Sequence, residues 1–443
     1  MGLRAAGARV DITPPVGTEL SGWCFGPSRG IADRLYARAL VLDDGHLPMV
    51  IITADLIGLG TQYAVRIREK VARCLGTTRA RVLVSCSHTH SGPGAMPLRR
   101  WGNVNHPYVE AFVESVVNMV EAAADRVEPA VMAFGRGVVP GICDNRRRDR
   151  GNVVDEELPV LAVFRADATP VAILYNYSCH PVAAHNDRNL ISADFPGYAA
   201  AVISERFGGV EPMFTLGAAG DVNPVEFHSL ELAESYGATI GTAVVDVVQE
   251  ITAGSGVRPI TDGDEQHAGL DAVSRVVKLP VAPLPSADWL RAERDQWAEE
   301  AKRIRESGGP ESKVEDALIK SGWAAEALEA VEVGSEVTHL DMEITALCMG
   351  KLAIVAMPGE LFVEIGMRIK EASPFALTAI VELANGSLCY LPTSEAYEKG
   401  GYETEFSAKV YGLYMLTAQT QEIIERAAAE LLGELAERHN VLN

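Results

Sequence analysis

Two hydrophobic periods alternate along the first part of the chain. Residues 49–54 form a short, β-branched apolar run, which is typical of a strand buried on both faces. The next segment carries Ile67, Val71 and Leu75 at helical spacing, so we predict an amphipathic helix there.

The same alternation continues to the end of the chain. Further strands are expected at 81–85, 159–164, 171–175, 213–216 and 351–356, with helices at 108–127 and 424–435. Such alternation favours an α/β fold in which helices flank a mostly buried mixed sheet. No internal repeat or low-complexity tract interrupts the pattern.

The segment at about 280–332 has a different character. Leu284-Pro285-Ser286 combines a helix stop with a Ser N-cap, and the charged stretch at 289–304 reads as a helix. Residues 308–310 (Gly-Gly-Pro) break that helix before a second one begins. We therefore predict one domain over residues 1–443 with a helical insertion, which could form a pocket wall, a lid or a dimer surface.

The composition of the chain argues against two classes of binding partner. A 48% hydrophobic fraction in 443 residues supports a large core, and the formal net charge of −21 argues against nucleic acid and anionic membranes. No apolar run approaches the roughly 20 residues of a membrane helix. We expect a small-molecule substrate and no stable membrane association, while homo-oligomerisation stays open.

The opening residues and the cysteines favour a cytoplasmic location. The first ten residues lack the apolar core of a secretory signal. The seven cysteines are an odd number without a CxxC pair, which suits buried thiols in a reducing compartment.

Candidate chemistry begins at residues 87–94, Ser-His-Thr-His-Ser-Gly-Pro-Gly, just after a predicted strand. On an extended segment His88 and His90 share one face, so both side chains can enter one site. One imidazole can bind a metal while the other meets the substrate. The alternative is a pair of turn histidines with local hydrogen bonds.

Three more strand ends carry polar or small residues. His180 follows an apolar strand, and Glu360 follows Met357-Pro358-Gly359 and opens a predicted helix. Residues 217–224 form a small-residue strand exit that lets a ligand approach the backbone. The alternatives are a structural histidine, a carboxylate favoured by the helix dipole, and a tight turn. Two neutral imidazoles with one carboxylate are, however, a common ligand set of catalytic zinc.

Seven motifs then occur in a specific order. They are residues 87–94, Asn145-Arg146, His180-Pro181, Ser192-Ala193-Asp194 with Gly197-Tyr198, Gly220-Asp221-Val222, Pro358-Gly359-Glu360, and Tyr390-x-x-Thr393-x-Glu395-x-Tyr397 with Tyr402. Together they resemble the catalytic domain of the neutral, non-lysosomal ceramidases. The resemblance extends from about Asp11 to about Glu405.

The resemblance implies a role for each matching residue. One Zn²⁺ per chain would be held by four ligands: His88, His180, Glu360 and Tyr390. Three groups would meet the scissile carbonyl and the leaving nitrogen: His90, Arg146 and Tyr402. A tyrosine is a plausible ligand because a bound metal lowers the pKa of a nearby phenol.

The chain departs from the family pattern in two respects. Asn223 stands where the family's Gly-Asp-Val-Ser-Pro has serine, and an amide cannot attack a carbonyl but can donate a hydrogen bond. We assign Asn223 and Asp221 to substrate binding, and consider Asp221 and Asp194 as groups that orient the histidines. The family also carries a C-terminal immunoglobulin-like domain and is usually exported. We expect neither feature here, and hence not ceramide as the substrate.

We therefore predict a zinc-dependent hydrolase that cleaves an amide bond of a small N-acyl compound with metal-activated water. One alternative is an ester or lactone hydrolase with the same zinc site, whose rate would hardly depend on His90. Another is a catalytically inactive, zinc-containing binding protein. The intact set of His90, Arg146 and Tyr402 argues against this last alternative.

Overall fold

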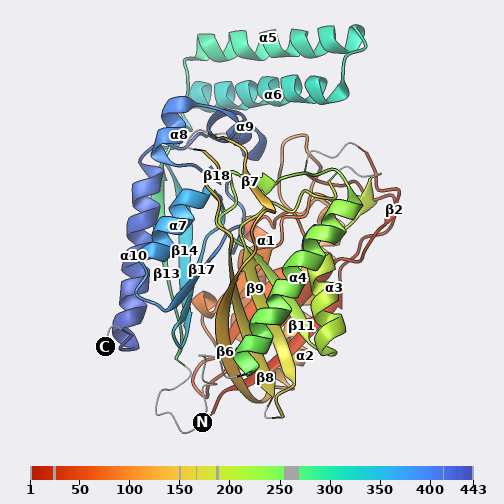
Figure 1. Cartoon of the computed structure of the whole chain (residues 1–443). Coiled ribbons are helices and arrows are strands. Elements are labelled where there is room, and N and C mark those ends of the chain that lie inside the picture. Colours follow the sequence, from red (N-terminus) through yellow and green to blue (C-terminus); the bar gives the residue numbers. More distant parts are fainter. Residues whose placement is uncertain are drawn as a thin grey trace.

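The computed structural model describes residues 2–22, 26–148, 151–165, 167–185, 189–253, 269–412 and 414–441. Two sheets form its centre (Figure 1). The larger has the order β11-β9-β8-β6-β1-β3-β4-β5, and the smaller has the order β13-β14-β15-β17. Both contain parallel and antiparallel pairs, which confirms the predicted mixed α/β class.

The strands of the larger sheet are β1 (Arg4–Asp11), β3 (Tyr36–Asp43), β4 (Met49–Ala54), β5 (Val82–Cys86), β6 (Glu128–Val138), β8 (Glu157–Arg165), β9 (Pro170–Tyr177) and β11 (Glu211–Leu216). Those of the smaller sheet are β13 (Leu270–Pro280), β14 (His339–Met349), β15 (Leu352–Ala356) and β17 (Leu377–Val381). Short paired strands are β2 (Gly30–Ile31), β7 (Cys143–Asn145), β10 (Leu190–Ile191), β12 (Val222–Pro224), β16 (Glu360–Leu361) and β18 (Tyr390–Leu391).

The helices are α1 (Thr61–Leu75), α2 (His106–Ala124), α3 (Asp194–Phe207), α4 (Leu230–Thr252), α5 (Ala287–Glu306), α6 (Glu311–Val333), α7 (Val363–Glu371), α8 (Ser394–Lys399), α9 (Ser407–Tyr411) and α10 (Thr420–Arg438). A 3-10 turn covers Arg79–Arg81, and a π-helical turn covers Tyr402–Phe406. None of these described helices is long and apolar enough to cross a membrane.

The two sheets pack face to face, so each has a shared inner face and an outer face covered by helices. In β3, Leu40 and Leu42 enter the core that lies between the sheets, whereas Ala39 and Val41 enter the core beneath α1 and α2. This is the two-residue period of a strand buried on both sides. Helices α3 and α4 cover the other half of the larger sheet, and α7 and α10 cover the smaller sheet (Figure 1). The predicted buried sheet is therefore two stacked sheets.

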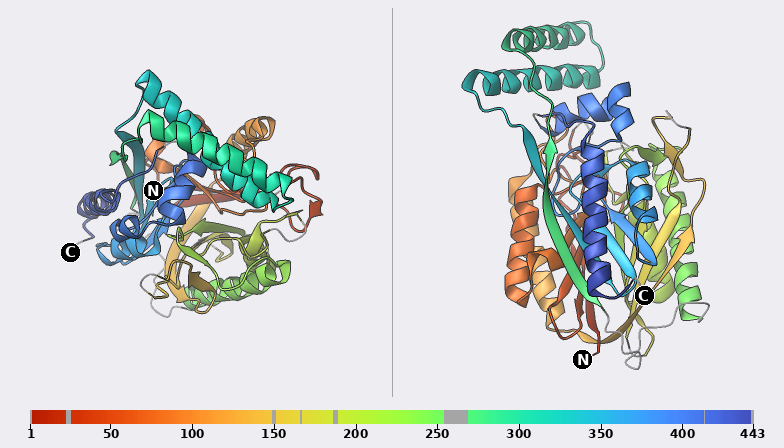
Figure 2. Two further views of the ribbon diagram at one scale, coloured as in Figure 1. Left: turned by 90° about the horizontal axis from the view of Figure 1, so that it is seen from above. Right: turned by 90° about the vertical axis from the view of Figure 1, so that its left-hand side faces the viewer.

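The helical hairpin of α5 and α6 lies between β13 and β14 in the sequence and projects from one end of the molecule (Figure 2). As predicted, Ser286 caps α5 by accepting a hydrogen bond from the backbone N–H of Trp289. Paired hydrogen bonds from Arg99 to Glu326 and from Arg100 to Glu315 tie α6 to the loop after β5. That the whole chain is one domain stays a prediction.

We predict that Gly237→Ala destabilises the fold, although alanine is the better helix former. A Cβ at Gly237 of α4 would lie 2.4 Å from Tyr198 Cβ and 2.7 Å from the Phe195 carbonyl of α3. Such overpacking costs about 1–3 kcal/mol. Gly433→Ala on α10 is the matched control, because nothing lies within 4 Å of the added Cβ. It should stabilise by roughly 0.5–1 kcal/mol. Urea unfolding measures both, and equal shifts of the two variants would contradict this account.

Candidate metal and active site

His88 and His90 reach one site by a route that differs from the predicted one. His88 has a φ of 70°, so the chain leaves the extended conformation directly after β5. Its backbone N–H donates to Leu56 O at 2.8 Å, which holds this left-handed turn in place. A non-glycine residue in this conformation costs about 1–2 kcal/mol and is often found at functional sites. The shared direction of the two rings therefore comes from a strained turn, not from the periodicity of a strand.

His180 follows β9 and lies beside the predicted carboxylate. Its backbone N–H donates to Val222 O at 3.1 Å, and its Nε2 lies 3.1 Å from Glu360 Oε2. The same carboxylate oxygen is 3.5 Å from His88 Nε2. All three side chains are buried.

The sequence predicted that Glu360 opens a helix. In the structure it does not, because α7 begins only at Val363. Glu360 belongs to β16, which pairs in parallel with β18 so that Glu360 lies opposite Tyr390. Gly220 allows this segment to come close, since a Cβ there would lie 2.6 Å from the Glu360 carbonyl oxygen. The small-residue strand exit thus accommodates the backbone of Glu360, where we expected a ligand.

The three imidazole rings each turn the Nε2 edge toward a common point between them. The Nδ1 atoms of His88, His90 and His180 lie 2.5, 2.9 and 2.7 Å from the carbonyl oxygens of Ile57, Gly22 and Ala219. A carbonyl only accepts hydrogen bonds, so each Nδ1 carries the proton and each neutral Nε2 presents a lone pair.

The His90 and His88 Nε2 atoms are 3.3 Å apart, and one ligand atom from each of the three rings lies within 4.8 Å of the others. Lone pairs and a carboxylate this close repel one another unless a cation lies among them. The residues therefore fit a metal ion, and their hydrogen-bonded Nδ1 atoms have the arrangement found in histidine ligands.

The protonation states agree with this geometry. Burial, together with the neighbouring histidines, lowers the pKa of His90 well below its ordinary value, so its ring is neutral at pH 7. Burial alone would raise the pKa of Glu360. Positive charge beside the carboxylate, which comes from protons on His88 and His180 when no metal ion is bound, nevertheless holds the pKa of Glu360 well below the ordinary range, so the carboxylate is ionised.

Three tyrosines surround Glu360. Tyr390 and Tyr402 were predicted, and their ring centroids are 5.6 Å apart. Tyr411 was not predicted, yet its hydroxyl donates to Glu360 Oε1, the oxygen that does not face His180. Burial raises the pKa of all three phenols. The motif that identified Tyr390 and Tyr402 ends before Tyr411, so no sequence motif pointed to this residue.

Arg146 lies across the site from the histidines. Its Nε donates to Glu403 at 2.8 Å, its Nη1 to Asn223 Oδ1 at 3.2 Å and its Nη2 to Gly220 O at 2.6 Å. Burial by itself would lower the pKa of this guanidinium, but Tyr390 and Glu403 raise it above the ordinary value, so Arg146 stays charged. Because Asn223 uses Oδ1 to accept from Arg146, its amide NH₂ is the group that it can offer to a substrate.

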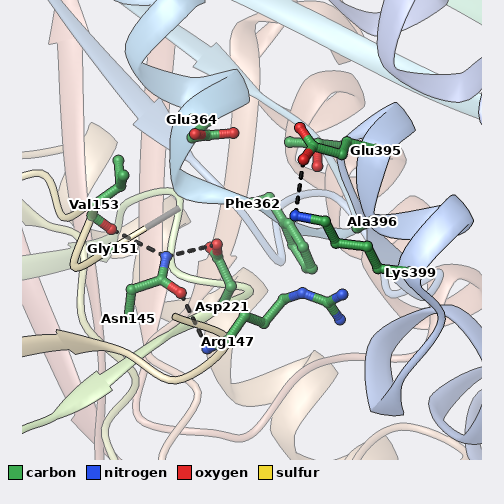
Figure 3. Close-up of a pocket in the computed structure, with 11 residues that line it drawn as sticks. Asn145, Arg147, Gly151, Val153, Asp221, Phe362, Glu364, Glu395, Ala396 and Lys399 are labelled. Atoms are coloured by element: carbon green, nitrogen blue, oxygen red, sulfur yellow. Dashed lines mark hydrogen bonds and ion pairs between the residues drawn. The ribbon is translucent and has the colours of Figure 1, made fainter. Parts of the chain in front are cut away.

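Asp221 supports this arrangement from behind. Its Oδ2 accepts from the Asn145 side chain and its Oδ1 from the Val363 backbone N–H, both at 2.8 Å. Figure 3 shows Asp221 and Asn145 beside Arg147 in a small cavity of about 30 Å³. The structure thus shows Asp221 holding β7 and the start of α7, outside the lining of the larger cavity described below, and its contact with substrate stays a prediction.

Asp194 likewise orients backbone and not an imidazole. Its carboxylate accepts from the backbone N–H groups of Ala184 and Phe195, each at 2.7 Å. It therefore fixes the loop that follows His180 against the start of α3.

A cavity of about 360 Å³ opens onto these groups. Its lining includes six predicted residues: His90, Arg146, His180, Asn223, Tyr390 and Tyr402. Sequence analysis did not identify the other six: Trp101, Val182, His185, Phe227, Asp316 and Phe406. Asp316 comes from α6, so the helical hairpin forms part of the pocket wall.

Comparison with known proteins finds relatives of this chain in sequence and in fold. Residues 6–224 match the N-terminal part of the neutral/alkaline non-lysosomal ceramidases. This chain belongs to that family. Two similar members are neutral ceramidase B of Dictyostelium discoideum and neutral ceramidase of Pseudomonas aeruginosa. The first is 26% identical over 201 residues and the second 25% over 194 residues. These matches cover 41% and 39% of this chain, and 28% of either relative's length.

The family likeness extends to the fold of the whole chain. The crystal structure of neutral ceramidase from Pseudomonas aeruginosa superimposes with a TM-score of 0.73 at 18% identity, over 99% of this chain and 75% of that one. A ceramidase complexed with C2 gives a TM-score of 0.72, also at 18% identity, over 99% of this chain and 76% of that one.

We predict that Tyr411→Phe weakens metal binding without unfolding the chain, because Glu360 loses the hydroxyl that orients its carboxylate. Loss of such an outer partner typically lowers metal affinity by roughly 10- to 100-fold. Competition for Zn²⁺ with a chromophoric chelator measures the change. Tyr414→Phe is the control, since the Tyr414 hydroxyl donates to the Ser335 carbonyl at 3.4 Å, at the surface of the protein. Equal affinities in the two variants would show that Tyr411 does not act on the metal.

Proposed function

We propose that this chain is a zinc-dependent hydrolase that cleaves an amide bond of a small N-acyl compound other than ceramide. The observation that carries the proposal is the convergence of imidazole lone pairs and an ionised carboxylate beside a charged arginine. Family membership supports hydrolysis, because the relatives are ceramidases. A cytoplasmic location and homo-oligomerisation are further proposals.

The donor set favours zinc over harder cations. Nitrogen and oxygen donors without thiolate suit Zn²⁺, whereas Mg²⁺ and Ca²⁺ prefer oxygen alone. The four proposed ligands of one ion are His88, His180, Glu360 and Tyr390. When bound there, Zn²⁺ would polarise the scissile carbonyl and lower the pKa of a water molecule to about 7.

His90 is the proposed proton carrier. It lines the cavity, is neutral, and directs its unprotonated Nε2 into the site. The ring can accept a proton from the attacking water and then return it to the leaving nitrogen. An amide needs this second step because a free amide anion is a very poor leaving group.

Arg146, Tyr402 and Asn223 are the proposed stabilisers of the oxyanion. The guanidinium carbon of Arg146 lies 5.4 and 5.6 Å from the ring centroids of Tyr390 and Tyr402, and contacts on three sides fix its orientation. Donors that are already oriented need no rearrangement as negative charge develops. With Asn223 in place of serine, no acyl intermediate forms at that position, so we propose direct hydrolysis.

The size of the cavity supports a small substrate. Its volume of about 360 Å³ lies near the lower end of the roughly 300–1,000 Å³ of ligand pockets. Aromatic side chains form much of its lining, which suits an apolar portion of a small molecule.

His90→Ala tests the assignment of roles. The variant should keep its zinc and lose about 10²- to 10⁴-fold in kcat/KM on short N-acyl amines. On the corresponding esters the loss should be small, because an alkoxide leaves with less help from an acid. Elemental analysis and steady-state assays give the two readouts. His339→Ala is the control, since His339 is partly exposed on β14, away from the cavity.

Two results would change the proposal. Loss of zinc in His90→Ala would make this residue a ligand. Hydrolysis of esters or lactones alone by the wild type would favour the alternative substrate class, and no hydrolysis of either class would favour a binding protein.

A further inference from the structure

Asp316 gives the cavity a negative charge on a helix that holds none of the candidate metal ligands. It lies on α6, and among the twelve residues that line the cavity it is the sole carboxylate. Its side chain is 27% exposed, so a charge placed against it is partly shielded from water. The α5–α6 hairpin supplies none of the candidate ligands, so this carboxylate enters the cavity wall from a different element than the histidines.

Aromatic side chains of the cavity lie close to α6, since Trp101 shares a buried cluster with Ile319 of that helix. Trp101 and Phe406 line the cavity and pack against each other with ring centroids 6.1 Å apart. Trp101 also stacks on Tyr402 at 6.3 Å. Aromatic faces attract cations, and a carboxylate beside them adds a charge-assisted hydrogen bond. The combination selects for a protonated amine over a neutral group of the same size.

The cations near Asp316 do not fill this position. Lys313 Nζ lies 3.5 Å from the carboxylate, but its side chain is 68% exposed, and such surface pairs contribute little. Lys320, one helical turn further along α6, directs its ammonium to the face of Trp297 on α5 at 3.8 Å. Its distance to the Phe406 centroid is 5.8 Å, and it is not part of the cavity lining.

We propose that Asp316 makes the pocket selective for substrates that carry a protonated amino group remote from the scissile amide. This inference rests on the proposed amide hydrolysis and narrows its substrate class to N-acyl diamines and related aminoalkyl amides. The α5–α6 hairpin is then the specificity element of the enzyme. Its role is to bring one carboxylate to the aromatic wall of the cavity.

The first test measures binding, so that it does not depend on catalysis. Pentylamine and 1-pentanol differ in one terminal group, ammonium against hydroxyl, and neither contains an amide. Titration calorimetry on the zinc-loaded full chain should show about tenfold tighter binding of pentylamine, since a charge-assisted hydrogen bond contributes roughly this much. Asp316→Asn should remove the preference and leave 1-pentanol binding within about twofold.

The second test measures turnover of the matching amides, N-acetylputrescine and N-pentylacetamide. The wild type should favour the first by about tenfold in kcat/KM, mainly through KM, and Asp316→Asn should equalise the two. Glu299→Gln is the control for a lost negative charge on the same hairpin, because Glu299 of α5 is 73% exposed and lies outside the cavity lining.

The outcomes separate the two proposals. A binding preference that Asp316→Asn abolishes, without cleavage of any amide, would overturn the hydrolase and leave the selectivity standing. Cleavage without a preference for the charged member of either pair would overturn the selectivity. So would a preference that persists in Asp316→Asn, or one that Glu299→Gln also abolishes.

Discussion

The candidate site depends on three backbone carbonyls that each accept a hydrogen bond from an imidazole Nδ1. Those of Ile57, Gly22 and Ala219 fix the tautomers of His88, His90 and His180, so that all three Nε2 lone pairs converge beside Glu360. An arrangement of this kind is electrostatically unfavourable by itself and becomes favourable with a cation at its centre. The loops that supply the carbonyls are therefore as much a part of the centre as the rings that they orient.

The stacked sheets bring these loops to one end of the molecule. The histidines follow strands of the larger sheet, whereas Glu360 follows β15 of the smaller sheet. Glu382, at the end of β17, joins the two parts because its buried carboxylate accepts from the backbone N–H groups of both Ala219 and Leu361. Burial raises the pKa of Glu382 well above its ordinary value, so it adds no full charge beneath Glu360.

Much of this could be predicted from the sequence, because strand ends followed by polar residues are local signals. Residues 49–54 and 213–216 were recognised by their apolar runs, and His88, His180 and Glu360 by their places after such runs. The separation into two sheets could not be predicted, since the residues of β3 are apolar on both faces whichever layer covers them. The left-handed turn at His88 and the β16–β18 pairing depend on contacts between distant segments and leave no periodicity.

The most direct test of the account is the metal content of the purified full chain after zinc is supplied and excess is removed. The account predicts about one zinc per chain in the wild type and its loss in both His88→Ala and Glu360→Gln, with the fold retained in each. No zinc in the wild type, or zinc that persists in both variants, would contradict a metal centre formed by these residues.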